Sequence, residues 1–125
     1  MKKSDSKLLT ETELELMSIL WRLEGGTVNE VLAELPRGRD LAYTSVSTIL
    51  RILEQKSVVK ARKEGRGHVY VPVLKRGDYE SKAVKHVVDR VFDGTPLALV
   101  RQLLNSGDLT EQDLEELRRM VEARK

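Results

Sequence analysis

Residues 42–56 carry polar and apolar side chains at helical spacing, which would place them on opposite faces of one helix. The apolar face would hold Val46, Ile49, Leu50 and Leu53, and the polar face would hold Thr44, Thr48, Arg51 and Gln55. Hydroxyl, amide and guanidinium groups, with no acid among them, suit the base edges and phosphates of a DNA major groove. Because small polar residues on an outer helix face often meet only water, this pattern alone leaves both interpretations open.

A strongly basic segment overlaps the end of this helix. Between Arg51 and Arg76 the chain has eight Lys and Arg against two Glu, a formal charge of +6, whereas the whole chain carries +2. Residues 58–63 and 68–73 flank the turn Glu64-Gly65-Arg66-Gly67, and the strict apolar alternation of the second segment predicts a β-hairpin. Such a local concentration of positive charge is typical of nucleic-acid sites, although it also occurs on proteins that bind nothing.

Two earlier helices would position these segments. The capping boxes Thr10-Glu11-Thr12-Glu13 and Thr27-Val28-Asn29-Glu30 mark their starts, Gly25-Gly26 would stop the first, and Pro36 would end the second. Trp21 continues the apolar stripe of the first helix, so we expect it to pack in the core instead of stacking on a base. Three helices followed by a basic hairpin predict a winged helix-turn-helix DNA-binding domain over residues 1–76.

Residues 77–125 predict a second domain made of helices alone. Thr95-Pro96 and a capping box at Thr110 mark the starts of its last two helices. Three amphipathic helices in fewer than about fifty residues cannot close a satisfactory core alone, so we expect a dimerisation domain that pairs with a second copy of the chain. Its expected contact residues are Val84, Val87, Val88, Val91, Leu97, Val100, Leu103, Leu114, Leu117 and Val121.

The composition argues against several other classes of function. The chain has no cysteine, and His68 and His86 lie in different predicted elements, so we expect no metal and no cofactor. No nucleophile paired with a base and no phosphate-binding glycine loop can be assembled, which argues against an enzyme. No apolar run approaches the roughly 20 residues that span a bilayer, so we expect a cytoplasmic protein with no membrane partner.

Several short motifs follow one another in a characteristic order. They are Leu9-Thr10-Glu11, Ile19-Leu20-Trp21, Thr27-Val28-Asn29-Glu30-Val31-Leu32, Leu41-Ala42-Tyr43-Thr44-Ser45-Val46, Leu53-Glu54-Gln55-Lys56, Tyr70-Val71-Pro72, Gly107-Asp108-Leu109-Thr110 and Leu114-Glu115-Glu116-Leu117. Their order and spacing, over about residues 9–120, closely resemble the penicillinase repressor (BlaI/MecI) family of transcriptional regulators. The resemblance implies a dimeric winged-helix repressor whose third helix enters the major groove, whose wing touches the backbone, and whose C-terminal helices hold two protomers across a palindromic operator. It also implies targets that are often genes for β-lactam resistance.

Three features depart from that family's pattern. In antibiotic-responsive members an Asn-Phe bond is cleaved under the control of a membrane sensor protease, and this chain has Gln102-Leu103 at that place, so such a partner stays open. The cysteine-rich tail of a copper-responsive branch is absent, which argues against direct copper sensing. Ser57 stands where a glycine usually follows the third helix, so this helix must stop at a less favourable residue.

The sequence therefore predicts a mainly α fold with a small β-hairpin, and a sequence-specific repressor that binds double-stranded DNA as a homodimer and controls resistance or stress genes. Contacts to bases and nearby phosphates are expected from Thr44, Ser45, Thr48 and Arg51, with Ser47 at the flank, and backbone contacts from Lys60, Arg62, Lys63 and Arg66. The alternative is a winged-helix module that docks an acidic protein partner. Such a module has little need of a +6 segment around its wing.

Overall fold

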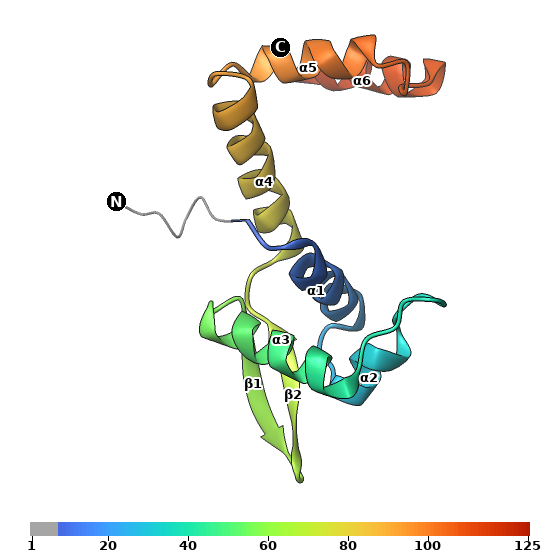
Figure 1. The fold of residues 1–125 in the computed structure, drawn as a ribbon. Helices are drawn as coiled ribbons and strands as arrows, with labels where there is room; N and C mark the ends of the chain where they lie inside the picture. The colour runs from blue at the N-terminus through green and yellow to red at the C-terminus, as the bar shows by residue number, and fades with distance from the viewer. Residues whose placement is uncertain (1–7) are drawn as a thin grey trace. The chain divides into compact units, whose positions relative to one another are not determined.

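The computed structural model describes residues 8–125, which form six helices and one two-stranded sheet (Figure 1). In chain order the elements are α1 (Glu11–Leu23), α2 (Val28–Ala33), α3 (Tyr43–Gln55), β1 (Val59–Glu64), β2 (Gly67–Pro72), α4 (Arg76–Val91), α5 (Pro96–Asn105) and α6 (Glu111–Ala123). The predicted fold class, mainly α with a small β-hairpin, is confirmed. None of these helices is long and apolar enough to cross a membrane.

The chain divides into two compact units, one ending at Ala83 and the other beginning at Val84. This division lies well inside α4, whereas the sequence pattern predicts a boundary at the start of that helix, between residues 76 and 77. The difference arises because the first turns of α4 pack on the first unit. Tyr79 is buried there, its hydroxyl accepts a hydrogen bond from the Leu9 N–H at 3.1 Å, and its ring lies 6.0 Å from that of Trp21.

A buried core joins the first three helices to the hairpin. Its fully buried side chains are Leu16, Met17 and Leu20 of α1, Val31 of α2, and Val46, Leu50 and Leu53 of α3. Trp21 packs against this core, and its Nε1 donates to the carbonyl of Leu74 at 2.8 Å, so its predicted packing role is confirmed. The Arg76 guanidinium lies over the Trp21 ring, 5.7 Å from its centroid, in cation–π geometry.

The predicted capping boxes form at the starts of α1, α2 and α6. In each box the threonine hydroxyl accepts the backbone N–H of an acidic residue three positions on, whose carboxylate accepts the threonine N–H. The pairs are Thr10 with Glu13, Thr27 with Glu30, and Thr110 with Asp113. Thr95 is the N-cap of α5, but its side chain accepts no capping hydrogen bond, so Pro96 remains the main signal for that start.

Helix α1 ends differently from the sequence-based prediction, which placed its stop at Gly25-Gly26. Glu24 itself takes the left-handed conformation, with a φ of 65°. The two glycines instead bring the chain against β2. Gly26 and Tyr70 exchange two backbone hydrogen bonds, at 3.0 and 2.8 Å, and a Cβ on Gly25 would lie 3.4 Å from the Tyr70 carbonyl oxygen. The glycine pair therefore attaches the hairpin to the helical core.

Helix α3 ends in a Schellman motif that has serine where glycine is usual. Ser57 has a φ of 66°; its N–H donates to the carbonyl of Glu54 at 2.9 Å, and the Val58 N–H donates to the carbonyl of Leu53 at 3.1 Å. The prediction that α3 stops at a less favourable residue is confirmed, because the left-handed conformation costs an L residue roughly 1–2 kcal/mol.

An ion pair links the start of α1 to the end of α3. The Lys56 Nζ lies 2.8 and 3.0 Å from the two carboxylate oxygens of Glu13, which is buried. Burial alone would raise the pKa of Glu13, but hydrogen bonds and charge from Lys56, together with the Thr10 N–H, outweigh burial and hold that pKa below 4.5. Glu13 therefore caps α1 and fixes α3 with the same carboxylate.

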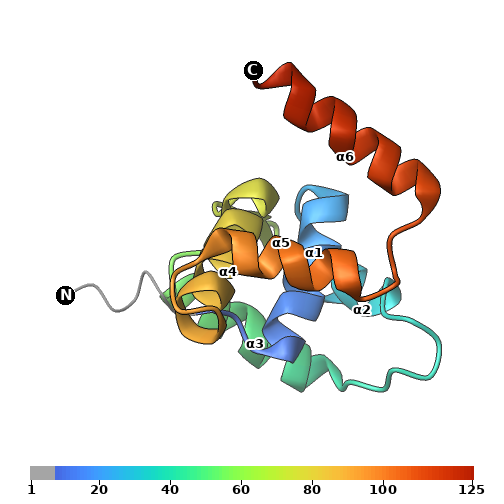
Figure 2. The same cartoon turned by 90° about the horizontal axis from the view of Figure 1, so that it is seen from above.

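The C-terminal unit leaves apolar side chains uncovered. Neither α5 nor α6 contains a buried residue, and the two helices share few contacts with each other. Figure 2 shows them as separate rods joined by residues 106–110. Apart from Val88 of α4, the apolar residues of this unit are not buried within one chain.

Replacing Ser57 with glycine should raise the free energy of unfolding by about 1 kcal/mol, because glycine adopts positive φ without strain. Ser47→Gly is the matched control: Ser47 lies within α3, where the same change should lower the free energy of unfolding by roughly 0.5–1 kcal/mol. Urea unfolding at one protein concentration measures both. A loss of stability in Ser57→Gly would show that the serine side chain contributes more than the strain costs.

Replacing Lys56 with methionine keeps most of the aliphatic stem and should lower the free energy of unfolding by about 1–3 kcal/mol near neutral pH. The pKa of Glu13 is lower in the folded protein than its ordinary value of 4.5. The stability that Glu13 contributes is therefore fully present above about pH 4.5 and is lost as the pH falls through the folded pKa. The difference between wild type and Lys56→Met in urea unfolding should therefore shrink below about pH 4.5. A difference that stays constant at every pH would contradict an ionic origin.

Candidate nucleic-acid interface

Helix α3 presents a polar face to solvent because its opposite face is fully buried. Val46, Leu50 and Leu53 each have 0 % exposure. On the far side Thr44, Thr48 and Arg51 are exposed, with exposed Ser45 and half-buried Ser47 at the two edges of this face. The structure therefore gathers the five residues expected to contact bases and nearby phosphates on one accessible side of one helix.

The start of α3 differs from the starts of α1, α2 and α6. Its N-cap, Ala42, provides no capping side chain, and its first turn has no acidic residue. The backbone N–H groups there and the positive end of the helix dipole meet no competing negative charge from their own turn, which suits a phosphate. Tyr43 opens this turn and is 51 % exposed. Sequence-based prediction missed it, although a large aromatic residue at the first position of an uncapped helix could have indicated it.

The hairpin register divides the predicted wing residues between two faces. Side chains alternate along each strand, and residues that pair directly share a face. Lys63 pairs with His68, and both share a face with Tyr70, which is buried against the core. Lys60 and Arg62 lie on the other face. The four cations predicted for the wing therefore do not form one surface.

The turn of the hairpin places the fourth predicted cation at the tip of the wing. Glu64 pairs with Gly67, so Gly65 and Arg66 form a two-residue turn. Gly65 has a φ of 60° at the first turn position, which requires glycine in this hairpin type. Figure 1 shows the tip extending well beyond α3, and Arg66 is exposed there.

A groove of about 520 Å³ lies between α3 and the inner face of the wing. It is lined by Ser47, Arg51, Glu54, Ala61, Lys63, His68 and Tyr70. Arg51 and Lys63, which the sequence places in different elements, thus line one site. His68 lies with them, although the sequence-based prediction considered it only as a candidate metal ligand and did not include it among the expected DNA contacts. The strict alternation of β2 predicts that His68 lies on the same side of the strand as Tyr70, and this pattern could have indicated that His68 lines the groove.

Tyr70 closes the core end of this groove. Burial raises its pKa above 10.0, the nearby carboxylate of Glu54 raises it further, and Arg51 acts in the opposite direction. The phenol is therefore uncharged at neutral pH. Glu54 is the one acid among the residues that line the groove, against the two permanent cations Arg51 and Lys63.

Ion pairs remove part of the positive charge counted between residues 51 and 76. Three cations have carboxylate partners: Lys56 with Glu13, Arg62 with Glu64, and Arg76 with Glu80. Within residues 8–125 the cations of this segment that have no such partner are Arg51, Lys60, Lys63, Arg66 and Lys75. All but Lys75 lie on α3 or the hairpin, so the uncompensated charge concentrates there. Both side chains of the ion pair between Arg62 and Glu64 are exposed to solvent, so this pair is weak.

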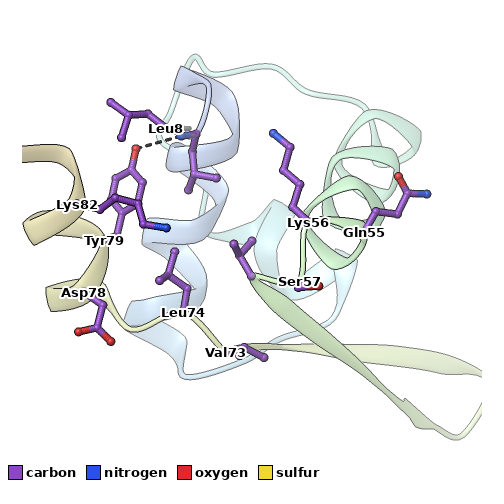
Figure 3. A pocket seen from close by; sticks show the side chains of 11 residues that line it. Leu8, Gln55, Lys56, Ser57, Val73, Leu74, Asp78, Tyr79 and Lys82 are labelled. Carbon is purple, nitrogen blue, oxygen red and sulfur yellow. Dashed lines mark hydrogen bonds between the residues drawn. The ribbon is translucent and has the colours of Figure 1, made fainter. Parts of the chain in front are cut away.

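A second concave site lies at the C-terminal end of α3 (Figure 3). This cavity of about 620 Å³ is bounded by the start of α1, the end of α3, the residues after β2 and the first turns of α4. Leu8, Leu74 and Tyr79 contribute apolar walls, and Lys82 lies at its side. None of the residues predicted to contact DNA lines it. Within residues 8–125, no three histidine or acidic side chains form a cluster that could hold a metal ion.

The residues predicted to form a dimer contact are mostly accessible. Exposure of 41–67 % is found for Val84, Val91, Leu97, Val100, Leu103, Leu114 and Val121, while Val87 and Leu117 are half-buried. Val88 differs, because it is only 6 % exposed in the single chain and has little surface left for a partner. Leu104 and Met120 are as accessible as the predicted residues, and the sequence-based set missed them.

Known proteins resemble this chain over nearly its whole length. The profile of the penicillinase repressor family matches residues 9–123. The penicillinase repressor of Bacillus licheniformis is 28 % identical over 117 residues, which cover 94 % of this chain and 91 % of the relative. The methicillin resistance regulatory protein MecI of Staphylococcus aureus strain N315 is 23 % identical over 113 residues, which cover 90 % of this chain and 92 % of the relative.

Two solved structures are also similar. The DNA-binding domain of the repressor BlaI has a TM-score of 0.52 and 33 % identity, covering 63 % of this chain and 94 % of that domain. The monomeric form of Bacillus licheniformis BlaI in complex with the blaP half-operator has a TM-score of 0.50 and 33 % identity, with the same coverage of 63 % and 94 %. The winged-helix fold predicted from the sequence is confirmed. Since the family profile spans almost all of the described residues, the protein belongs to the penicillinase repressor family.

Proposed function

We propose that this protein is a sequence-specific transcriptional repressor that binds a palindromic DNA operator as a homodimer. The observation that carries the proposal is the exposed polar face of α3, formed by Thr44, Ser45, Thr48 and Arg51, beside the unpaired cations of the wing. Hydroxyl and guanidinium groups in this arrangement suit a major groove and its flanking phosphates. Membership in a family of repressors, and the similarity to a relative solved with a half-operator, support this function over docking of an acidic protein.

Each part of the interface then has a distinct role. Thr44 and Thr48, at the centre of the polar face of α3, contact base edges, and Ser45 and Ser47 contact the flanks. Arg51 lies toward the wing, where it lines the groove and reaches a neighbouring phosphate. The uncapped start of α3 holds another phosphate through its backbone N–H groups. Contacts of this backbone type position the protein, whereas those to base edges select the sequence.

The wing contributes backbone contacts from two sides. Lys63 acts from the face toward α3, and Arg66 acts from the tip. Lys60 and Arg62 act from the outer face, where Arg62 exchanges Glu64 for a phosphate, because its exposed ion pair is weak. The four cations therefore follow the DNA backbone on both sides of the hairpin, and their contribution decreases as salt increases.

The second protomer is held by the C-terminal unit. The apolar residues exposed on α5 and α6 would lose contact with water in a dimer, and they are too numerous for a helical unit that stands alone. A two-fold dimer presents two copies of α3 to two half-sites, which matches a palindromic operator. The half-operator bound by the monomeric relative is consistent with this arrangement.

The regulated genes belong to resistance or stress responses, in line with the names of the penicillinase and methicillin-resistance relatives. The protein acts where the genome is accessible, in the cytoplasm. A membrane sensor protease is the candidate upstream partner, although Gln102-Leu103 replaces the Asn-Phe pair cleaved in antibiotic-responsive members. Both residues are exposed on α5, and the proposed dimer would cover Leu103.

Replacing Thr48 with alanine should weaken binding to a cognate duplex by roughly 1–3 kcal/mol and weaken binding to a scrambled duplex much less, because base contacts carry the sequence information. Replacing Arg66 with alanine should weaken both by a similar factor and make the slope of log K against log salt shallower by about one unit per protomer. The cognate duplex is one that the protein selects from a random-sequence pool. Fluorescence titrations measure binding, and circular dichroism confirms folding. Equal losses on both duplexes for Thr48→Ala would place sequence recognition elsewhere.

Replacing Leu103 with glutamate should weaken dimerisation by at least about tenfold, because each copy would place a charge in an apolar contact. Gln102→Glu is the matched control, since it adds the same charge at the adjacent exposed position of α5 and should leave dimerisation nearly unchanged. Equilibrium sedimentation at several protein concentrations measures both variants and the wild type. A wild type that stays monomeric at micromolar concentration would contradict the two-fold operator.

A further inference from the structure

The groove between α3 and the wing brings together three side chains that can bind an anion. Arg51 comes from α3, Lys63 from β1 and His68 from β2, and the hydroxyl of Ser47 lies on the same wall. Lys63 and His68 are directly paired across the hairpin, so their side chains leave the same face side by side. All three of these potential cations are exposed, and neither Arg51 nor Lys63 has a carboxylate partner within residues 8–125.

We propose that this groove holds one phosphate group of the DNA backbone and that His68 becomes a ligand of that phosphate when it is protonated. The proposal rests on the proposed DNA-binding function. A phosphodiester fits because α3 and the wing would both approach the duplex, and the strand between their contacts passes the groove. The guanidinium, the ammonium and the imidazolium supply donors from two sides, which a single helix face cannot do.

The groups around His68 determine the direction of the pH effect. Arg51 and Lys63 face it with positive charge, Glu54 faces it with negative charge, and Tyr70, the neighbour on its own strand, is neutral. Protonated His68 would add a third positive charge beside those of Arg51 and Lys63 in this groove. A bound phosphodiester brings one negative charge among these groups, so it attracts the imidazolium and reduces the repulsion between the cations. DNA binding should therefore take up protons, and the affinity should increase as the pH falls through the range in which histidine titrates.

The chain offers a matched control for this effect. Its two histidines are His68, in the groove, and His86, in α4 beyond the division between the two units. Glutamine can replace either one without adding a charge. A pH effect that comes from the groove disappears in His68→Gln and persists in His86→Gln, whereas a general effect of pH on the protein or the DNA persists in both.

The test is a titration of the full chain with a cognate and a scrambled duplex at about pH 6 and about pH 8, at constant ionic strength. The wild type and His86→Gln should bind both duplexes about tenfold more tightly at the lower pH. His68→Gln should show little change with pH and should match the wild type at the higher pH. Calorimetry near neutral pH in two buffers of different ionisation enthalpy should show proton uptake on binding by the wild type that His68→Gln lacks.

The possible outcomes separate this proposal from the proposed function. Equal pH dependence and equal proton uptake in the wild type and His68→Gln would overturn the role of His68, while binding of the duplex would leave the repressor function standing. Failure of the wild type to bind any selected duplex would overturn the function itself.

Discussion

Complete burial of one face of α3 is the constraint on which the proposed interface depends. Rotating this helix about its axis would expose Val46, Leu50 or Leu53, at a cost of roughly 1.5–3 kcal/mol for each side chain. The polar face therefore has a fixed direction, although none of its residues makes a side-chain hydrogen bond within the described chain. At its C-terminal end the helix is held further by Glu13, which binds Lys56. Recognition residues can thus remain free for DNA because other residues hold their helix.

The wing is positioned by Tyr70, whose side chain packs in the core while its backbone forms hydrogen bonds at the edge of the sheet. Tyr70 inserts its ring beside α3 and α1, and its backbone pairs with Gly26 on the edge away from β1. The chain reaches this position through Gly25, whose φ of 130° is a conformation that residues with a side chain rarely adopt. The distance between α3 and the wing is therefore set at the base of the hairpin. This leaves the cationic side chains nearer the tip to line the groove without forming the fold's own contacts.

Much of the fold could be predicted from local pattern, because capping boxes, helical spacing and strand alternation are properties of neighbouring residues. The exposure of Thr44, Ser45, Thr48 and Arg51 on α3 could be predicted in this way. The groove could not, because the alternation of β2 shows that His68 and Tyr70 share a side but does not show which side meets α3. The formal charge of residues 51–76 likewise overstates the free positive charge, because Glu13 pairs with Lys56 from a helix 43 positions away in the sequence. The boundary of the first unit likewise depends on where Tyr79 packs, which no local pattern reveals.

The separation of the two units has a thermodynamic consequence for the proposed repressor. One α3 offers few base contacts, so one protomer discriminates weakly between sequences, and joining two protomers raises the effective concentration of the second α3 at its half-site. Since α5 and α6 bury no residue within one chain, the dimer that provides this gain depends on protomer concentration. Occupancy of the operator would then rise more steeply than protein concentration. An event that weakens the dimer contact formed by α5 and α6 of the two protomers would release DNA without altering α3 or the wing. Regulation can therefore act on the C-terminal unit while the recognition surface stays intact.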